Sequence, residues 1–161
     1  MAAPEIPPFP AFVAAPDLHE TIALPGLGIE QRVRVPSAAT GGQLCLIEEV
    51  TAPGAGPPRH LHRTQTELFR FLDGDYVLEI DGQPLPAPPG TVAVVPPGRS
   101  HAFKNRGTTP GRLLFLLTPA EDAEGFFRSL ARLLAEGATD PARLNAALGR
   151  FGFEITGPPI A

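Results

Sequence analysis

Three of the four histidines in this 161-residue chain lie near one glutamate, within residues 54–105. His60 and His62 are separated by one residue, Glu67 follows His62 by five positions, and His101 lies further along the chain. Side chains two positions apart share one face of a β-strand, so His60 and His62 can direct both imidazoles to one point. Imidazole and carboxylate groups are common ligands of divalent transition metals. The spacing therefore predicts a metal site.

The elements that must position these residues are short strands. A reversal over residues 63–65 is expected to bring Glu67 back along a strand beside the histidines. Phe69 and Phe71 continue from Glu67 with a period of two, so they should face the same cavity. A proline-proline-glycine turn at 96–98 is expected to set the next strand, which carries the third histidine, facing inward.

Two segments match both signature motifs of the cupin superfamily in their spacing. They are G-x5-H-x-H-x4-E-x6-G at residues 54–74 and G-x5-P-x-G-x2-H-x3-N at residues 90–105. The chain therefore resembles a cupin. The resemblance implies a mainly β fold, the double-stranded β-helix or jelly roll of two facing antiparallel sheets. It also implies one divalent transition metal (Fe, Mn, Co, Ni or Zn). The residues that match the family's metal ligands are His60, His62, Glu67 and His101.

Proline and glycine separate short β segments from residue 31 onward, as expected for a barrel or sandwich. The predicted strands cover residues 32–35, 43–51, 66–72, 76–80, 91–95, 102–106 and 112–118. Asp73-Gly74 and Asp81-Gly82 predict tight turns that join 66–72, 76–80 and the segment after Gln83 as consecutive antiparallel pairs. Prolines confine that last segment to a sheet edge or an irregular loop.

The hydrophobic period changes from two to 3.6 after Thr118. Thr118-Pro119 and Asp140-Pro141 both have the form of a helix start, and an apolar stripe begins at Phe126. A C-terminal helical hairpin is therefore predicted, packed on the barrel or at a dimer contact, with a lid over the site as the alternative. The predicted organisation is an extended N-terminal arm at 1–30, a cupin barrel at 31–118 and C-terminal helices packed on the barrel at 119–161.

The N-terminal arm is rich in proline and alanine, so it cannot form a helix or a central strand. Its apolar side chains would become ordered by lying on the barrel or on a partner subunit. They are Ile6, Phe9, Phe12 and Val13. We therefore expect a homodimer.

Composition excludes several classes of partner. The net charge of -4 and the single lysine give no basic surface for a nucleic acid. Only one cysteine is present, which excludes an internal disulfide. No apolar run is long enough to span a bilayer, and no signal peptide is recognisable, so a cytoplasmic protein with a small-molecule substrate is expected.

The aromatic residues near the histidines predict an apolar substrate pocket. Its predicted lining is Phe69, Phe71, Tyr76, Leu78 and Phe103. Such a wall favours an aromatic or hydrophobic substrate. Arg59, Arg63 and Arg99 flank the histidines, where one could bind a carboxylate, although a solvated arginine is the alternative for each.

The C-terminal tail, GFFRSLARLLAEGATDPARLNAALGRFGFEITGPP, is similar in pattern to the tails of bacterial single-domain cupins resembling quercetin 2,3-dioxygenase. This resemblance implies a metal-dependent dioxygenase that acts on an aromatic or enol-bearing small molecule. In that reaction Glu67 would be catalytic as well as a ligand, because it could take the substrate hydroxyl proton. Two alternatives stay open: a non-redox isomerase, decarboxylase or cyclase, and a small-molecule binding or sensor module.

Overall fold

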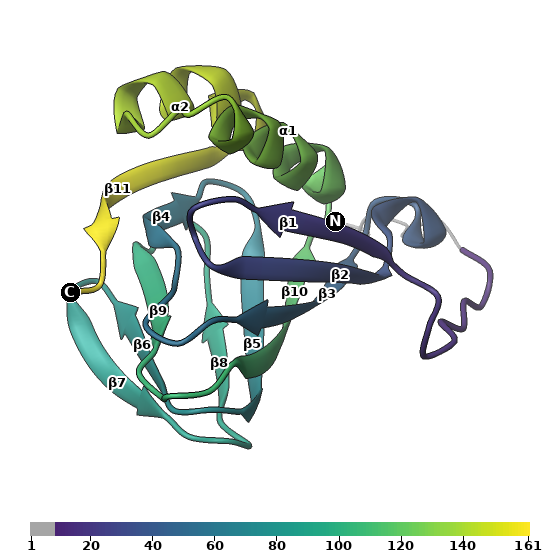
Figure 1. The fold of residues 1–161 in the computed structure, drawn as a ribbon. Coiled ribbons are helices and arrows are strands. Elements are labelled where there is room, and N and C mark those ends of the chain that lie inside the picture. Colours follow the sequence, from purple (N-terminus) through teal and green to yellow (C-terminus); the bar gives the residue numbers. More distant parts are fainter. Residues whose placement is uncertain (1–8) are drawn as a thin grey trace, which may run out of the picture.

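The computed structural model describes residues 9–161, which form two facing antiparallel sheets with two helices over one end (Figure 1). The strands are β1 Glu20–Leu24, β2 Ile29–Val35, β3 Cys45–Thr51, β4 Pro58–His62, β5 Thr66–Asp73, β6 Tyr76–Ile80, β7 Gln83–Ala87, β8 Val92–Val95, β9 His101–Asn105, β10 Gly111–Thr118 and β11 Phe153–Pro159. The helices are α1 Ala123–Ala135 and α2 Pro141–Leu148, with short 3-10 turns at Ser37–Thr40 and Gly149–Phe151. One sheet has the order β1-β2-β3-β10-β5-β8 and the other β11-β4-β9-β6-β7. The predicted jelly roll with a C-terminal pair of helices is confirmed.

Alternation along the strands decides which side chains enter the barrel. On β10, Leu113, Phe115 and Leu117 are buried, while the residues between them are more exposed. β5 shows the same alternation, with a buried row that begins at Glu67 and continues through two phenylalanines. A charged residue therefore enters the interior because it occupies an inward position on a strand that apolar neighbours hold in place.

The Asp73-Gly74 turn does not form the predicted hairpin. β5 and β6 belong to different sheets, so this turn carries the chain across the barrel. Gly74 has a φ of 103°, and a Cβ there would lie 2.9 Å from the Cα of Gly111. A side chain at Gly74 would thus be strained and crowded. The Asp81-Gly82 turn does join β6 to β7 as predicted, and the proline-rich β7 lies at a sheet edge.

The predicted arm at 1–30 is too long. β1 and the first part of β2 pair with each other inside the six-stranded sheet, from Glu20 opposite Val33 to Leu24 opposite Ile29. The buried side chains of β1 hold it against the core. Residues 1–8, including Ile6, lie outside the described residues. The homodimer expected from the arm stays a prediction.

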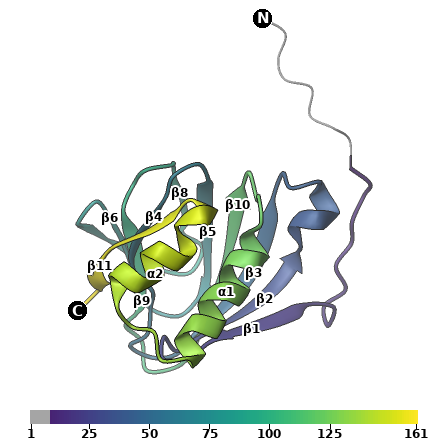
Figure 2. The same cartoon turned by 90° about the horizontal axis from the view of Figure 1, so that it is seen from above.

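The C-terminal segment differs from the predicted helical tail in two ways. α1 begins after Asp122, whose side chain accepts a hydrogen bond from the backbone N–H of Gly125, rather than at Thr118-Pro119. α2 begins at Asp140-Pro141 as predicted. The chain then returns as β11, which pairs with β4. Figure 2 shows both helices lying over the sheets. No helix in the described residues is long and apolar enough to cross a membrane.

Candidate metal centre

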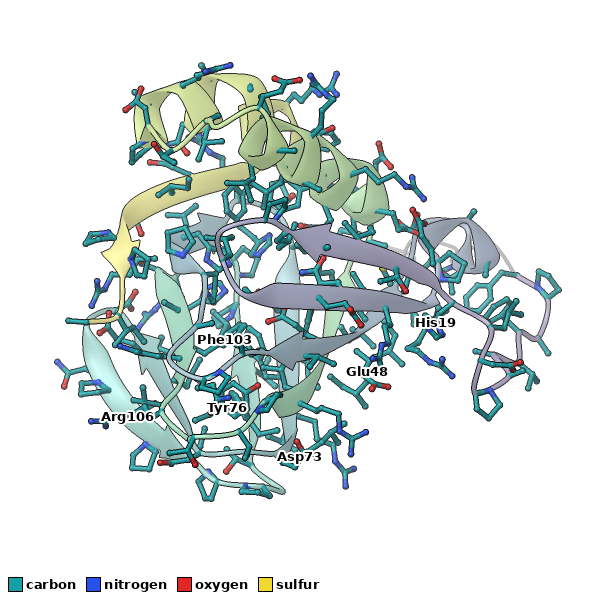
Figure 3. The ribbon with its side chains drawn as sticks, in the orientation of Figure 1. His19, Glu48, Asp73, Tyr76, Phe103 and Arg106 are labelled. Atoms are coloured by element: carbon teal, nitrogen blue, oxygen red, sulfur yellow. The ribbon has the colours of Figure 1, made fainter. Side chains whose placement is uncertain are left out.

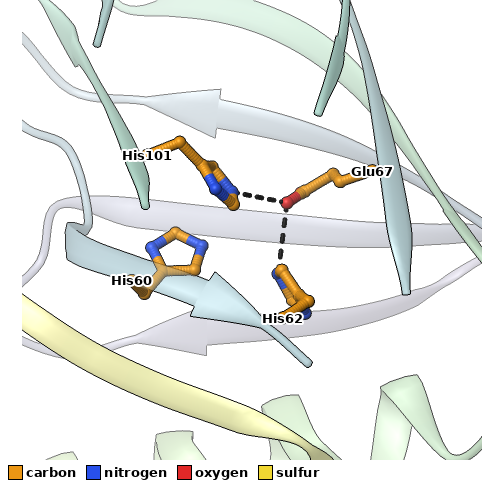
Figure 4. A group of neighbouring side chains, drawn as sticks. All are labelled: His60, His62, Glu67 and His101. Carbon is orange, nitrogen blue, oxygen red and sulfur yellow. Dashed lines mark hydrogen bonds and ion pairs between the residues drawn. The ribbon is translucent and has the colours of Figure 1, made fainter. Parts of the chain in front are cut away.

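The four predicted ligands converge inside the barrel, at the end that the helices cover (Figure 4). His60 and His62 come from β4 and His101 from the start of β9, where His60 and His101 are paired in register. Glu67 enters from β5 in the opposite sheet. The predicted strand pairing between the histidines and Glu67 is therefore wrong: the carboxylate reaches them across the barrel. Possible ligand atoms of all four lie within 4.8 Å of one another, and all four residues are buried.

Each imidazole is oriented through its Nδ1 atom. His60 Nδ1 lies 2.8 Å from the carbonyl oxygen of Pro58, and His101 Nδ1 lies 3.0 Å from that of Arg99. A carbonyl oxygen only accepts hydrogen bonds, so both Nδ1 atoms carry the proton and both Nε2 atoms are left with a lone pair when the rings are neutral.

Gln65 gives His62 the same orientation. The side-chain Nε2 of Gln65 donates to the carbonyl oxygens of Pro119 and Ala120 at 3.0 and 2.9 Å, which fixes its Oε1 towards His62. That oxygen lies 3.0 Å from His62 Nδ1 and accepts a hydrogen bond from its N–H group. The three histidines therefore all present Nε2 to the cluster. Metal-bound histidines typically donate a hydrogen bond from the ring nitrogen that does not face the metal.

The electrostatics of the cluster call for a cation at its centre. Glu67 Oε2 lies 2.8 Å from His101 Nε2 and 3.2 Å from His62 Nε2. A carboxylate oxygen facing two ring nitrogens without hydrogen atoms needs a proton or a metal ion between them. Burial opposes ionisation of Glu67, but hydrogen bonds with His101 and His62 lower its pKa. Burial and the neighbouring His101 and His62 lower the pKa of His60, which disfavours a proton there.

These donors fit a divalent transition metal. Three imidazole nitrogens and one carboxylate oxygen leave coordination positions open for water or substrate on a five- or six-coordinate ion. Burial also opposes protonation of His101, although its hydrogen bond with Glu67 raises its pKa overall. The four side chains together could hold an ion without further ligands from the chain.

Two positions of the cupin motifs support the cluster without touching its centre. Gly98 has a φ of 80°, and its backbone N–H donates to the carbonyl oxygen of His62 at 2.7 Å, which fixes the turn before His101. Asn105 donates from Nδ2 to the carbonyl oxygens of Thr51 and Thr109. The asparagine therefore ties the end of β9 to β3 and to the loop before β10.

The cluster opens into a cavity of about 330 Å³. Its wall is mostly apolar and comes from both sheets, both helices and β11; among its residues are Leu24, Phe115, Phe126, Leu130, Leu144 and Ile155. The ring of Phe153 stacks on that of His60 with centroids 4.9 Å apart. The C-terminal segment is thus part of the cavity wall, beyond the packing role predicted for it.

The predicted pocket was largely misplaced. Phe103 lines the cavity, whereas Phe69, Phe71, Tyr76 and Leu78 are not among the lining residues and pack in the barrel core. In Figure 3, Tyr76 lies further from the helices than Phe103. Burial raises the pKa of Tyr76 to about 12.

The three arginines that flank the histidines are each engaged in an ion pair. Arg59 pairs with Glu79, Arg63 with Glu154, and Arg99 with Asp81. Among the described residues, the cavity wall contains no arginine or lysine. The predicted carboxylate clamp is therefore not formed inside the cavity.

Two buried polar residues of the cavity wall were not predicted. Gln31 and Glu49 line the cavity and are each 2% exposed. A signal for Glu49 was present: counting by two from the buried Cys45 along β3 places Ile47 and Glu49 on the inner face. Gln31 lies opposite Glu49 in register on β2, and the predicted strand at 32–35 begins one residue after it.

The family model for the cupin domain matches residues 47–117. Over this segment the chain is similar to a cupin domain. The match includes the four clustered residues, the six complete strands from β4 to β9, and most of β3 and β10.

Individual proteins also resemble this chain, in fold or in sequence. The structure of KdgF from Halomonas sp. is similar with a TM-score of 0.64 and 16% identity, over 71% of this chain and 99% of that one. A cupin sugar phosphate isomerase from Silicibacter pomeroyi has a TM-score of 0.55 and 28% identity, over 65% and 74%. The probable oxidoreductase yanE of Aspergillus niger is 32% identical over 82 residues, 50% of this chain. The match spans only 32% of that relative.

Proposed function

We propose that this cupin binds one divalent transition-metal ion through His60, His62, Glu67 and His101, and that it is a dioxygenase acting on an aromatic or enol-bearing small molecule. The observation that carries the proposal is the full set of three histidines and one carboxylate opening into a mostly apolar cavity of about 330 Å³. A cavity of that size and character suits a small, mainly apolar substrate.

When bound, a redox-active ion would supply a Lewis acid for a substrate enolate oxygen and a site for dioxygen. Glu67 would both hold the ion and take the substrate hydroxyl proton, since its carboxylate is kept ionised by His101 and His62. Phe103 and Phe153 would pack against the substrate rings, and the apolar wall would exclude water. The partial likeness to a probable oxidoreductase supports this reaction class.

The main alternative is a non-redox cupin enzyme. The likeness to a sugar phosphate isomerase favours it, at 28% identity. A phosphorylated sugar, however, needs cationic or strongly polar groups, and the described cavity wall holds no arginine or lysine. A binding or sensor module is the third candidate and needs only the cavity.

Oxygen uptake tests these candidates. The protein would be loaded separately with Fe, Mn, Co and Ni and supplied with flavonols, with and without dioxygen. We expect substrate loss coupled to dioxygen consumption with at least one metal. Turnover without dioxygen would support the non-redox alternative, and binding without turnover under any metal would support the binding module.

A further inference from the structure

The cavity has a second polar point, formed by Gln31 on β2 and Glu49 on β3. The two residues are opposite each other in register. Gln31 Nε2 donates to Glu49 Oε2 at 3.1 Å, and Thr51 Oγ1 lies 3.2 Å from Glu49 Oε1. Both Gln31 and Glu49 line the same cavity as the metal cluster. Their neighbours on the inner faces of these strands are mainly apolar.

The hydrogen bonding of this pair is incomplete. Gln31 Oε1 is buried and has no hydrogen-bond partner among the described residues. An unmatched buried polar atom costs about 1–3 kcal/mol. Burial raises the pKa of Glu49 to about 8, so its carboxyl keeps a proton at neutral pH. The pair thus carries an unused acceptor beside a carboxyl group that can donate.

The pair and the metal cluster occupy different levels of the cavity wall. Glu67 and Cys45 are both paired with Leu117 of β10, and Glu49 lies four residues beyond Cys45 along β3. That separation is about 13 Å along the strand. A molecule that reaches both points needs a polar group at each end and an apolar body between them.

We propose that Gln31 and Glu49 bind an uncharged hydroxyl or carbonyl group at the end of the substrate remote from the metal cluster. The substrate is then a neutral aromatic molecule with polar groups at both ends. This inference rests on the proposed function, because it assumes that the substrate occupies this cavity beside the metal. It assigns specificity, and not the chemical step, to the pair.

The test uses two probes that differ by one distal hydroxyl, 2-naphthol and 2,6-naphthalenediol. Their binding to the zinc-loaded full chain is measured by calorimetry. In the wild type the diol should bind about tenfold more tightly, as expected for one buried hydrogen bond. Gln31→Leu and Glu49→Leu should each remove this preference.

The matched control is Glu48→Gln, because Glu48 is the neighbour on β3 that pairs with Arg32 and Arg112 outside the cavity. It should keep the preference. If Glu49→Leu does not fold, Gln31→Leu alone decides. An equal preference in the wild type and in Gln31→Leu, or no binding of either probe, would overturn the inference. Failure of the proposed dioxygenase would instead appear as absent dioxygen consumption with the hydroxyl preference intact.

Discussion

His62 and Glu67 each supply a ligand atom to the cluster, from opposite sheets. Removing either leaves three of the four donors, so His62→Ala and Glu67→Ala should each lower the metal content of the purified protein. Elemental analysis by mass spectrometry measures it. His19→Ala is the control, since His19 contacts Arg34 and is not part of the cluster. Full metal occupancy in both ligand variants would refute the assigned site.

Gln65 is a positioning residue, because it orients His62 and is itself held by two backbone carbonyls. Gln65→Leu should weaken metal affinity by about 10- to 100-fold while all four ligands remain. Competition with a chelator measures the affinity. The control is Gln83→Leu, an exposed glutamine on β7. An unchanged affinity in Gln65→Leu would show that the Nδ1 contact of His62 is dispensable.

At the level of single residues, the sequence was sufficient for the ligands but not for their surroundings. The identity and spacing of His60, His62, Glu67 and His101 carried the prediction of the cluster. The backbone carbonyls that accept from Nδ1 are invisible in a sequence, because any residue supplies one. Gln65 could not be recognised either, since its role depends on a loop that returns from 55 residues away.

At the level of elements, the strand positions were predictable and their pairing was not. Alternation identified β5 and β6, yet Asp73-Gly74 fits a hairpin turn and a crossover between sheets equally well. β11 was missed because one glycine and two prolines end its short alternation of Phe153 and Ile155 with polar residues. The part of the cavity wall that β11 and the helices contribute was therefore not foreseen.

Asn145 of α2 holds β11 in place through two hydrogen bonds with the backbone of Ile155. Its Nδ2 donates to the carbonyl oxygen of Ile155 at 3.1 Å, and its Oδ1 accepts from the N–H of Ile155 at 2.7 Å. Asn145→Ala leaves both groups of Ile155 without a partner and should lower the free energy of unfolding by about 1–3 kcal/mol. Urea unfolding measures it, with the exposed Arg143→Ala as control. Equal stability of Asn145→Ala and wild type would contradict this role.

On the scale of the whole molecule, the helices and the barrel share one hydrophobic core. The ring of Phe127 on α1 lies 5.7 Å from that of Phe115 on β10. We therefore expect one unfolding transition, with the same midpoint for helical circular dichroism and for the single tyrosine, Tyr76, inside the barrel. Phe127→Ala should lower both midpoints together, because it should reduce the free energy of unfolding by about 3–5 kcal/mol. Earlier loss of the helical signal would contradict a shared core.

Glu49 should make the stability of the whole molecule depend on pH. Its pKa is raised from 4.5 to about 8 by burial, with Gln31 and Thr51 opposing the shift and the charge of Glu67 adding to it. The folded protein therefore holds a proton that the unfolded chain releases above pH 4.5. Between pH 4.5 and about 8 the free energy of unfolding should fall, by up to about 1.4 kcal/mol per pH unit from this group.

Glu49→Gln removes that titration, so its stability should decline less than that of the wild type over the same range. Urea unfolding of both metal-free proteins at pH 5 and pH 8 gives the difference, in which the contributions of the other titrating groups largely cancel. Glu48→Gln should follow the wild type, since Glu48 pairs with Arg32 outside the barrel. Parallel stability curves for wild type and Glu49→Gln would mean that Glu49 is already ionised in the folded protein, and that Gln31 and Thr51 compensate its buried charge.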